Sequence, residues 1–199
     1  MQLDSQRVDI RKRMRSLRKN LSQTEQKSAA NALNINISQV IKVKKATKIG
    51  GYLSNDGEPD LSPAFENIWG QKGRTYLPII HPFSGVHLLF QHYEKNSPMK
   101  ANRYAILEPV LNCSHICPVA ELDYILTPLV AFDSQGNRLG MGGGFYDRTF
   151  AQIPDDKVKK PILIGVAHQC QEVDTLPIAS WDVPLDYIIT PERIYCTTR

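Results

Sequence analysis

Apolar positions along the chain gather in short runs that are separated by segments with a helical period. Five runs have the length of a strand and few polar interruptions, and they are 49–53, 74–77, 124–132, 161–167 and 186–190. Such runs are typical of strands in a parallel sheet that is covered on both faces. A less regular run, 86–93, is expected to pair antiparallel at an edge, and Pro78 is expected to end the strand before it. The pattern predicts a single α/β domain over residues 1–199, a three-layer αβα sandwich.

The first helix, roughly 3–21, combines an apolar stripe with clustered basic residues. Its apolar side chains fall within an arc of about 60° on a helical wheel, and they are Leu3, Ile10, Met14, Leu17 and Leu21. Four basic side chains lie within about 80° of one another beside this stripe, and they are Arg7, Arg11, Arg15 and Arg18. A solvated basic face would lie opposite the core. The observed position favours guanidinium groups that reach a bound phosphate, and a solvated basic helix is the alternative.

Two further helices flank the first strand. Ser22 and Glu25 have the spacing of a capping box, which predicts a helix over roughly 22–41. The strand 49–53 ends in a turn, and the helix after this turn buries Ala64, Phe65, Ile68 and Trp69. Ligands of open α/β sheets sit at the carboxyl ends of strands, so Glu58 in the turn is a candidate site residue. The alternative is a solvent-exposed turn residue.

The stretch 123–148 carries the strongest functional signal. Its apolar strand is followed by a polar turn, by Arg138 and Leu139, and then by Gly140-Met-Gly-Gly-Gly144. Glycines between a buried strand and a helix that begins at Phe145 let backbone N–H groups converge on an anion. The stretch is neither a P-loop, which needs Gly-Lys-Ser/Thr, nor the dinucleotide fingerprint, whose third glycine would fall on Phe145. We interpret it as a phosphate site, with a flexible connecting turn as the alternative.

Composition narrows the possible classes of protein. The chain has 199 residues, of which 42% are hydrophobic and 22% charged, and its formal net charge is +4. Because it has neither an apolar signal core nor an apolar run of roughly 20 residues, we expect a cytoplasmic protein with no membrane partner. The four cysteines are too few and too scattered for a disulfide scaffold, so they are expected to be free thiols. Cys113, His115 and Cys117 offer three ligands where structural zinc needs four, so no zinc site is expected. A nucleic-acid partner is not expected, because no aromatic stacking motif accompanies the basic helix.

The residues 132–148 read F-D-S-Q-G-N-R-L-G-M-G-G-G-F-Y-D-R. This string resembles the signature of the 5-formyltetrahydrofolate cyclo-ligase family (5,10-methenyltetrahydrofolate synthetase), and matches near both ends extend the resemblance over the whole chain. The resemblance implies a Rossmann-like αβα fold with a mixed sheet. It also implies an ATP- and magnesium-dependent ring closure of 5-formyltetrahydrofolate to 5,10-methenyltetrahydrofolate, with release of ADP and phosphate.

The resemblance also implies roles for individual residues. The implied ATP contacts are Arg7, Arg11, Arg138, Leu139, Gly140, Met141, Gly142, Gly143, Gly144, Phe145 and Tyr146. The implied folate contacts are Leu53, Glu58, Tyr104, Met141, Gly142, Gly143, Gly144 and Phe145. Asp182 matches a magnesium ligand of the family. From their own chemistry beside the glycines, Asp147 is a second candidate ligand for magnesium, and Arg138 and Arg148 are candidate catalytic cations. The loop departs from family members that place a lysine among the glycines, because Gly143 stands at that position.

The implied reaction demands little covalent chemistry from the protein. A formamide oxygen leaves poorly, but its phosphorylation by ATP gives an imidate-like phosphate that a neighbouring amine can attack. The protein must then neutralise the γ-phosphoryl group and hold the formyl oxygen in line. The expected partners are the folate and ATP, with Mg²⁺ as cofactor, and the protein is expected to act as a monomer. Another small-molecule kinase or ATP-dependent ligase on the same scaffold is the alternative function.

Overall fold

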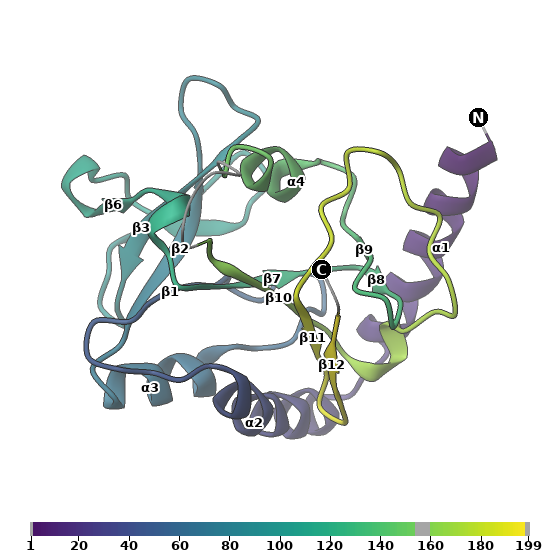
Figure 1. Cartoon of the computed structure of the whole chain (residues 1–199), viewed down its shortest axis with the longest axis horizontal. Coiled ribbons are helices and arrows are strands. Elements are labelled where there is room, and N and C mark those ends of the chain that lie inside the picture. The colour runs from purple at the N-terminus through teal and green to yellow at the C-terminus, as the bar shows by residue number, and fades with distance from the viewer. Residues whose placement is uncertain (1, 154–159, 198–199) are drawn as a thin grey trace.

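The computed structural model describes residues 2–153 and 160–197. Within these residues, eight strands form one sheet in the order β12-β11-β10-β7-β1-β2-β3-β6 (Figure 1). The inner strands run parallel, and they are β11 (Tyr187–Ile189), β10 (Ile162–Val166), β7 (Tyr124–Pro128), β1 (Lys48–Gly50) and β2 (Arg74–Ile80). Antiparallel strands lie at both edges, and they are β12 (Ile194–Cys196), β3 (Leu88–Tyr93) and β6 (Ile116–Cys117). The mixed sheet and the antiparallel edge pairing of 86–93 are confirmed.

Helices α2 (Gln23–Val40) and α3 (Ser62–Gly70) cover one face of the sheet (Figure 1). The predicted capping box forms at the start of α2. The hydroxyl of Ser22 accepts a hydrogen bond from the backbone of Glu25, and the Glu25 carboxylate accepts one from the backbone of Ser22. Apolar side chains fill the layer between these helices and the sheet, and they include Leu33, Ile37, Phe65, Ile68, Leu126, Ile164 and Ile189. This layer supplies much of the hydrophobic stabilisation.

The opposite face carries α4 (Phe145–Phe150) (Figure 1). A second core lies on this face. Buried side chains of this core include Phe90, Ile125, Phe132, Phe150, Leu163 and Ile188. Helices thus lie on both faces of a mixed sheet, and the predicted α/β fold class is confirmed.

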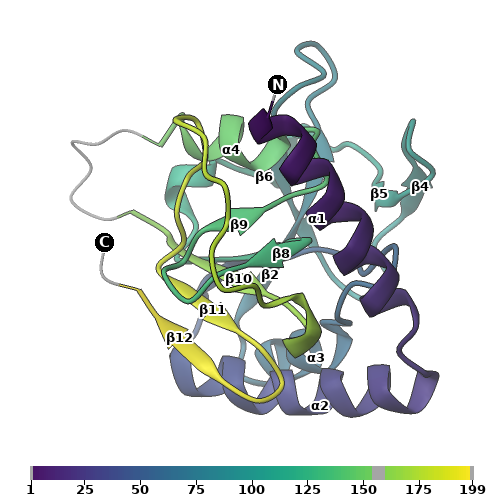
Figure 2. The same cartoon turned by 90° about the vertical axis from the view of Figure 1, so that its right-hand side faces the viewer.

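Helix α1 (Gln2–Lys19) packs against a small hairpin of β8 (Ala131–Phe132) and β9 (Arg138–Leu139) (Figure 2). Its neighbours include the 3-10 helix η3 (Gln169–Gln171). The expected apolar stripe is only partly correct, because Met14 is buried while Leu3 and Leu17 are 37% and 43% exposed. Arg7 and Arg18 of the same helix are buried, although they are charged. The buried guanidinium groups of Arg7 and Arg18 donate hydrogen bonds to carbonyl and carboxylate oxygens of neighbouring segments, which makes their burial possible.

Two expected strand limits are wrong. The run 124–132 is divided, since β7 ends at Pro128 and the chain then leaves the sheet to form β8. Strand β2 also continues through Pro78, which pairs with Phe90 of β3. On its other side β2 pairs with β1 only as far as Tyr76, so the missing N–H of Pro78 removes no ladder hydrogen bond there.

Strand β1 is shorter than the run 49–53 predicted, because its last residues turn toward a cavity. The N–H of Gly51 donates to the carbonyl of Tyr76 at 2.8 Å. A Cβ at Gly51 would lie 2.6 Å from the ring of Phe65, so the close approach of α3 requires glycine.

The remaining described elements lie beyond the main sheet or between its strands. They are the hairpin of β4 (Met99–Ala101) and β5 (Leu107–Pro109) and the 3-10 helices η1 (Cys113–His115) and η2 (Val119–Glu121). No helix in the described part of the chain is long and apolar enough to cross a membrane.

Candidate active site

A cavity of about 510 Å³ opens where β1, β2 and β7 end. This is the edge at which open α/β sheets bind ligands. Its apolar lining includes Leu53, Pro78, Ile80, Leu88, Ile106, Leu107 and Leu129. Most residues with an implied folate contact also line it, namely Leu53, Glu58, Tyr104, Met141, Gly143, Gly144 and Phe145. The remaining one, Gly142, faces the guanidinium group of Arg11 instead.

The hairpin of β4 and β5 forms one side of the cavity mouth. Tyr104, between the two strands, is 54% exposed, and its ring centroid lies 6.0 Å from that of Phe145 in an edge-to-face contact. The Arg103 guanidinium lies 5.1 Å from the Tyr104 ring centroid and donates to the carbonyl of Gly85 at 2.6 Å. Aromatic groups from two distant segments therefore meet across the mouth, where a flat ligand ring can lie between apolar surfaces.

Two glutamate side chains, Glu58 and Glu108, are among the residues that line the cavity. Glu58 has a side chain that is 11% exposed, and burial raises its pKa to about 7 despite the opposing charge of Arg18. Glu108 is buried, and its Oε2 accepts hydrogen bonds from the backbone of Ile80 at 3.2 Å and the side chain of Asn102 at 3.3 Å. No sequence pattern pointed to Glu108, which lies in the least regular part of the chain.

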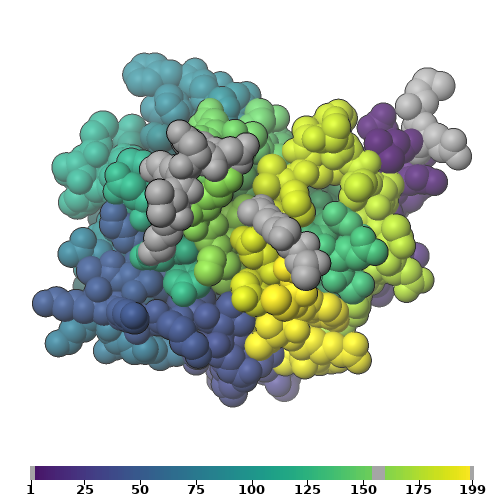
Figure 3. Space-filling view, in the orientation of Figure 1, coloured from purple at the N-terminus to yellow at the C-terminus, as the bar shows by residue number. Residues whose placement is uncertain are grey.

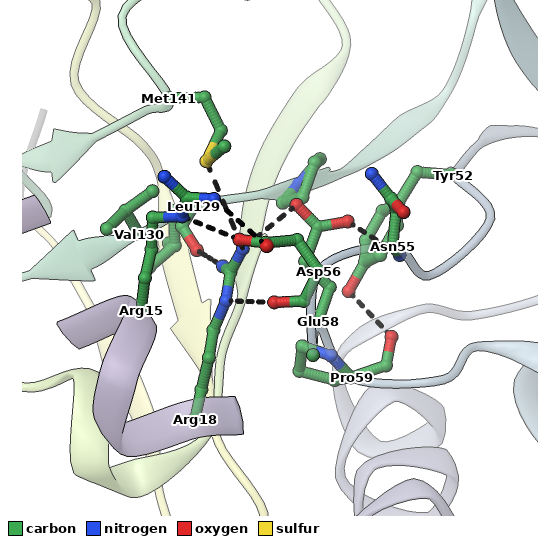
Figure 4. A network of polar contacts seen from close by, with 12 residues as sticks. Arg15, Arg18, Tyr52, Asn55, Asp56, Glu58, Pro59, Leu129, Val130 and Met141 are labelled. Atoms are coloured by element: carbon green, nitrogen blue, oxygen red, sulfur yellow. Dashed lines mark hydrogen bonds and ion pairs between the residues drawn. The ribbon is translucent and has the colours of Figure 1, made fainter. Parts of the chain in front are cut away.

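Asp56, two residues before Glu58, is surrounded by cations from α1 (Figure 4). Arg15 Nε and Arg18 Nη2 donate to Asp56 Oδ2 at 2.7 and 2.9 Å, and Lys19 pairs with its other oxygen. The hydrogen bond from Arg15 is the main reason that the pKa of Asp56 lies well below its usual range. Sequence reasoning did not single out Asp56, although an Asn-Asp-Gly turn at a strand end was a possible signal.

Arginine side chains hold the carbonyl groups of the glycine loop, 140–144. Arg11 Nε donates to the carbonyl of Gly140 at 2.8 Å. Arg148 donates to the carbonyls of Gly143 and Val86, and it therefore supports the loop from outside the cavity. Helix α4 after the loop has only six residues, so the expected contribution of a helix dipole is small and the loop's own N–H groups would have to bind an anion.

Arg138 is buried beneath this loop. Its Nη2 donates to Asp147 Oδ1 at 2.6 Å, and its guanidinium carbon lies 5.8 and 5.5 Å from the ring centroids of Tyr146 and Phe150. Arg138 Nε is buried without a hydrogen-bond partner among the described residues. Arg138 and Asp147 both line the cavity. Arg138 thus lines the cavity beside the glycine loop as a cation with one N–H donor that no described residue accepts.

The two aspartates that are candidate magnesium ligands come together in space. The backbone N–H of Val183 donates to Asp147 Oδ1 at 3.2 Å, which places Asp182 next to Asp147. Arg7 donates to both oxygens of Asp182, at 2.5 and 2.9 Å, and to the carbonyl of Pro177 at 3.0 Å. Burial tends to raise the pKa of Asp182, but the hydrogen bonds from Arg7 and Ala179 outweigh this effect and the pKa is lowered.

In the described part of the chain, one oxygen of this pair of carboxylates is open to a ligand, while both oxygens of Asp182 are bonded to Arg7. Asp147 bonds through Oδ1, and no partner of its Oδ2 is found among residues 2–153 and 160–197. The same residues contain no group of three or more histidine, cysteine, aspartate or glutamate side chains suited to hold a metal. Mg²⁺ commonly binds through one or two carboxylates, with substrate phosphates and water completing its octahedron.

The segment 176–184 lies beside the N-terminal half of α1 (Figure 3), and Arg7 joins the two by donating to the carbonyl of Pro177. Arg7, Arg11 and Asp182 do not belong to the cavity lining. The structure therefore separates two sides, with the implied folate contacts mostly in the cavity and Arg7, Arg11 and Asp182 outside it.

A mixed α/β sheet with an apolar cavity at its strand ends, bounded by a glycine loop and by paired arginines and carboxylates, defines an enzyme that acts on a small molecule. The chain belongs to the 5-formyltetrahydrofolate cyclo-ligase family, whose profile matches residues 4–191.

Known relatives agree with this membership. The 5-formyltetrahydrofolate cyclo-ligase of Haemophilus influenzae is 44% identical over 90% of this chain and 94% of its own length. The enzyme of that name from Escherichia coli K12 is 44% identical over 77% of this chain and 82% of its own. The solved 5,10-methenyltetrahydrofolate synthetase of Aquifex aeolicus superposes with a TM-score of 0.79 at 28% identity, covering 96% of this chain and 92% of that one.

Proposed function

We propose that this protein closes 5-formyltetrahydrofolate to 5,10-methenyltetrahydrofolate, with ATP consumed to ADP and phosphate. The observation that carries the proposal is the position of the family string, because Arg138 to Phe145 forms the wall between the apolar cavity and the outer cluster of arginines and aspartates. The relatives that bear the name of this reaction align over most of the chain.

The cavity is the proposed folate site. Its apolar walls suit the pterin and aminobenzoyl rings, with Tyr104 and Phe145 at the mouth. Glu58 is the proposed acceptor for the N–H groups of the pterin edge, which an ionised carboxylate binds more strongly than a neutral one. The close apolar surroundings of Glu58 strengthen such hydrogen bonds once they form.

The outer side of the glycine loop is the proposed nucleotide site. Arg7 and Arg11 would bind phosphate oxygens there, together with backbone N–H groups of 140–144. Asp147 and Asp182 would hold Mg²⁺, which neutralises phosphate charge. Arg7 and Asp182 bind one another. A bound phosphate would offer Arg7 another negative partner, and a bound metal would offer Asp182 another positive one.

The protein's role in catalysis is then positioning and charge stabilisation. Arg138 reaches from the cavity wall toward the glycine loop, so its guanidinium can neutralise charge on the phosphoryl group during transfer to the formyl oxygen. Arg148 holds the loop in the position from which it binds phosphate. Both arginines remain predicted catalytic groups.

The test is direct. The purified protein is mixed with 5-formyltetrahydrofolate, Mg²⁺ and ATP, and the methenyl chromophore is followed while ADP is measured. We expect one ADP for each methenyl group formed. Omission of ATP, or replacement of Mg²⁺ by chelator, is expected to stop the reaction. Failure of folded protein to turn over fresh substrate would contradict the proposal. ADP release with another acceptor would instead favour a different small-molecule kinase or ligase.

The expected location in the cytoplasm, the monomeric state and the lack of a nucleic-acid partner remain predictions. Gel filtration with light scattering would measure the assembly state directly.

A further inference from the structure

Arg18 is a fully buried cation at the base of the proposed active site. Its side chain is 0% exposed, and a buried charge is costly unless it is paired and hydrogen-bonded. Every nitrogen of the guanidinium has a protein partner (Figure 4). Nε donates to the carbonyl of Asp56 at 2.8 Å, Nη1 to the carbonyl of Leu129 at 3.0 Å, and Nη2 to Asp56 Oδ2 at 2.9 Å.

These contacts join three segments that form the site. Asp56 lies in the turn that carries Glu58, and Leu129 follows β7 on the way to the glycine loop. The sulfur of Met141, within that loop, lies 4.0 Å from Arg18 Nη2. Arg18 itself belongs to α1, the helix that presents Arg7 to the proposed nucleotide site. One guanidinium therefore fixes the folate-side turn relative to the glycine loop and the nucleotide-side helix.

Arg18 is also an ion-pair partner of Glu58. Its Nη2 lies 3.8 Å from Glu58 Oε1. The other titratable groups that act on or respond to Glu58 are Asp56 in the same turn, Tyr52 after β1 and Tyr146 of α4. Burial is the main cause that raises the pKa of Glu58, while Arg18 lowers it and Asp56 raises it further. Arg18 is thus the cation that opposes protonation of a carboxylate in an apolar cavity.

We propose that Arg18 is a positioning residue for the folate, which holds the turn bearing Glu58 in place and stabilises the charged form of the Glu58 carboxylate, the form that accepts hydrogen bonds from the substrate. This inference rests on the proposed function, because it takes the folate as the ligand of the cavity.

Two substitutions with opposite electrostatic effects test the inference. Arg18→Met removes the opposite charge near Glu58, and Asp56→Asn removes a like charge. Equilibrium binding of 5-formyltetrahydrofolate without ATP is measured across about pH 6 to pH 8, which brackets the expected titration. We expect the pH of half-maximal binding to rise in Arg18→Met and to fall in Asp56→Asn. If the midpoint rises by about one pH unit, the ionised fraction of Glu58 at pH 7 falls from about one half to about one tenth, so Arg18→Met should lose about fivefold in affinity at that pH.

A purely structural role predicts a different result. Both substitutions remove a contact that holds the same turn, so loosening of the turn would weaken binding in both variants without opposite shifts of the midpoint. Arg15→Met is the matched control, because Arg15 also binds Asp56 but has a side chain that is 40% exposed. Its midpoint should change less than that of Arg18→Met.

The Arg18→Met variant is expected to fold. In Arg18→Met, Asp56 keeps Arg15 and Lys19 as partners. If that protein does not fold, Arg18→Lys retains the charge and should bind more weakly with a midpoint near that of the unmodified protein. Midpoints that stay the same in Arg18→Met and in Asp56→Asn alike, or that shift in one direction together, would overturn the inference. So would an Arg18→Lys protein that binds the folate as tightly as the unmodified protein. Failure of the unmodified protein to bind the folate would instead refute the proposed function.

Discussion

The protonation state of Glu58 is expected to control folate binding in the unmodified protein. Burial raises the pKa of Glu58 from 4.5 to about 7, which is an energetic cost of about 3 kcal/mol for the ionised form. A carboxylate with this pKa is about one tenth ionised at pH 6 and about nine tenths ionised at pH 8. If only the ionised form accepts the pterin's N–H groups, the Kd for 5-formyltetrahydrofolate should be about tenfold higher at pH 6 than at pH 8.

The stability of the free protein should show the opposite dependence. Because the folded-state pKa is raised, protonation of Glu58 favours the folded state, and this contribution is fully present below about pH 4.5 and lost as the pH rises through about 7. Glu58→Gln resembles the protonated side chain and should remove both effects. The Glu58→Gln variant should bind the folate weakly at every pH, while its melting temperature near pH 8 rises relative to the unmodified protein.

The assay is a titration of folate binding, without ATP, at several pH values, combined with thermal unfolding of both proteins. A Kd that is flat from pH 6 to pH 8 would show that Glu58 is not a pH-dependent acceptor in this range. A pH dependence that persists unchanged in Glu58→Gln would assign the titration to another group. Either result would refute the reasoning.

Three further predictions concern the other groups of the site. Arg7→Gln combined with Arg11→Gln should raise the KM for ATP by about tenfold or more and leave that for the folate nearly unchanged, because charge-assisted bonds to phosphate are lost. Asp147→Asn and Asp182→Asn should each raise the magnesium concentration that half-maximal activity requires, and the double variant should cost less than the sum of the two in kcat/KM because the shared site is already lost. Gly144→Ala should reduce kcat/KM, because φ is +65° and a Cβ would lie 2.6 Å from Arg148 Nη1, a strain of about 1–3 kcal/mol that should be visible in kinetics.

Matched controls distinguish these effects from general damage. Arg13→Gln removes an exposed cation from the same helix and should leave ATP kinetics unchanged. Gly70→Ala, in α3, meets no atom within 4 Å and should be neutral or stabilise by up to about 1 kcal/mol. Unchanged ATP kinetics in the arginine double variant would restore the interpretation of a solvated basic face. Additive aspartate effects would mean that the two carboxylates serve separate sites, and Gly144→Ala activity equal to that of Gly70→Ala would remove the argument for the loop's backbone.

The sequence by itself determined the fold class and the place of the chemistry. Strands with apolar runs and the Ser22 capping box are formed by residues that are close together in the sequence. They can therefore be predicted from local sequence patterns. The string from Phe132 to Arg148 carried the family resemblance that the comparisons confirm. A glycine loop with flanking cations can be recognised from residues close in sequence, since the chain itself brings them together.

Only the tertiary structure decided which residues share a site. Asp182 meets Arg7 across most of the chain length, and Glu108 reaches the cavity through a hairpin with no clear pattern. The helical wheel placed Arg18 beside the core, yet its burial depends on the Asp56 carboxylate and the Leu129 carbonyl, which belong to other segments. A helical wheel shows which side chains of one helix share a face, and it contains no information on hydrogen-bond acceptors from other segments. A charged side chain can be buried only where hydrogen-bond and ion-pair partners surround it. When these partners are far apart in the sequence, the packing of the whole fold decides whether they meet.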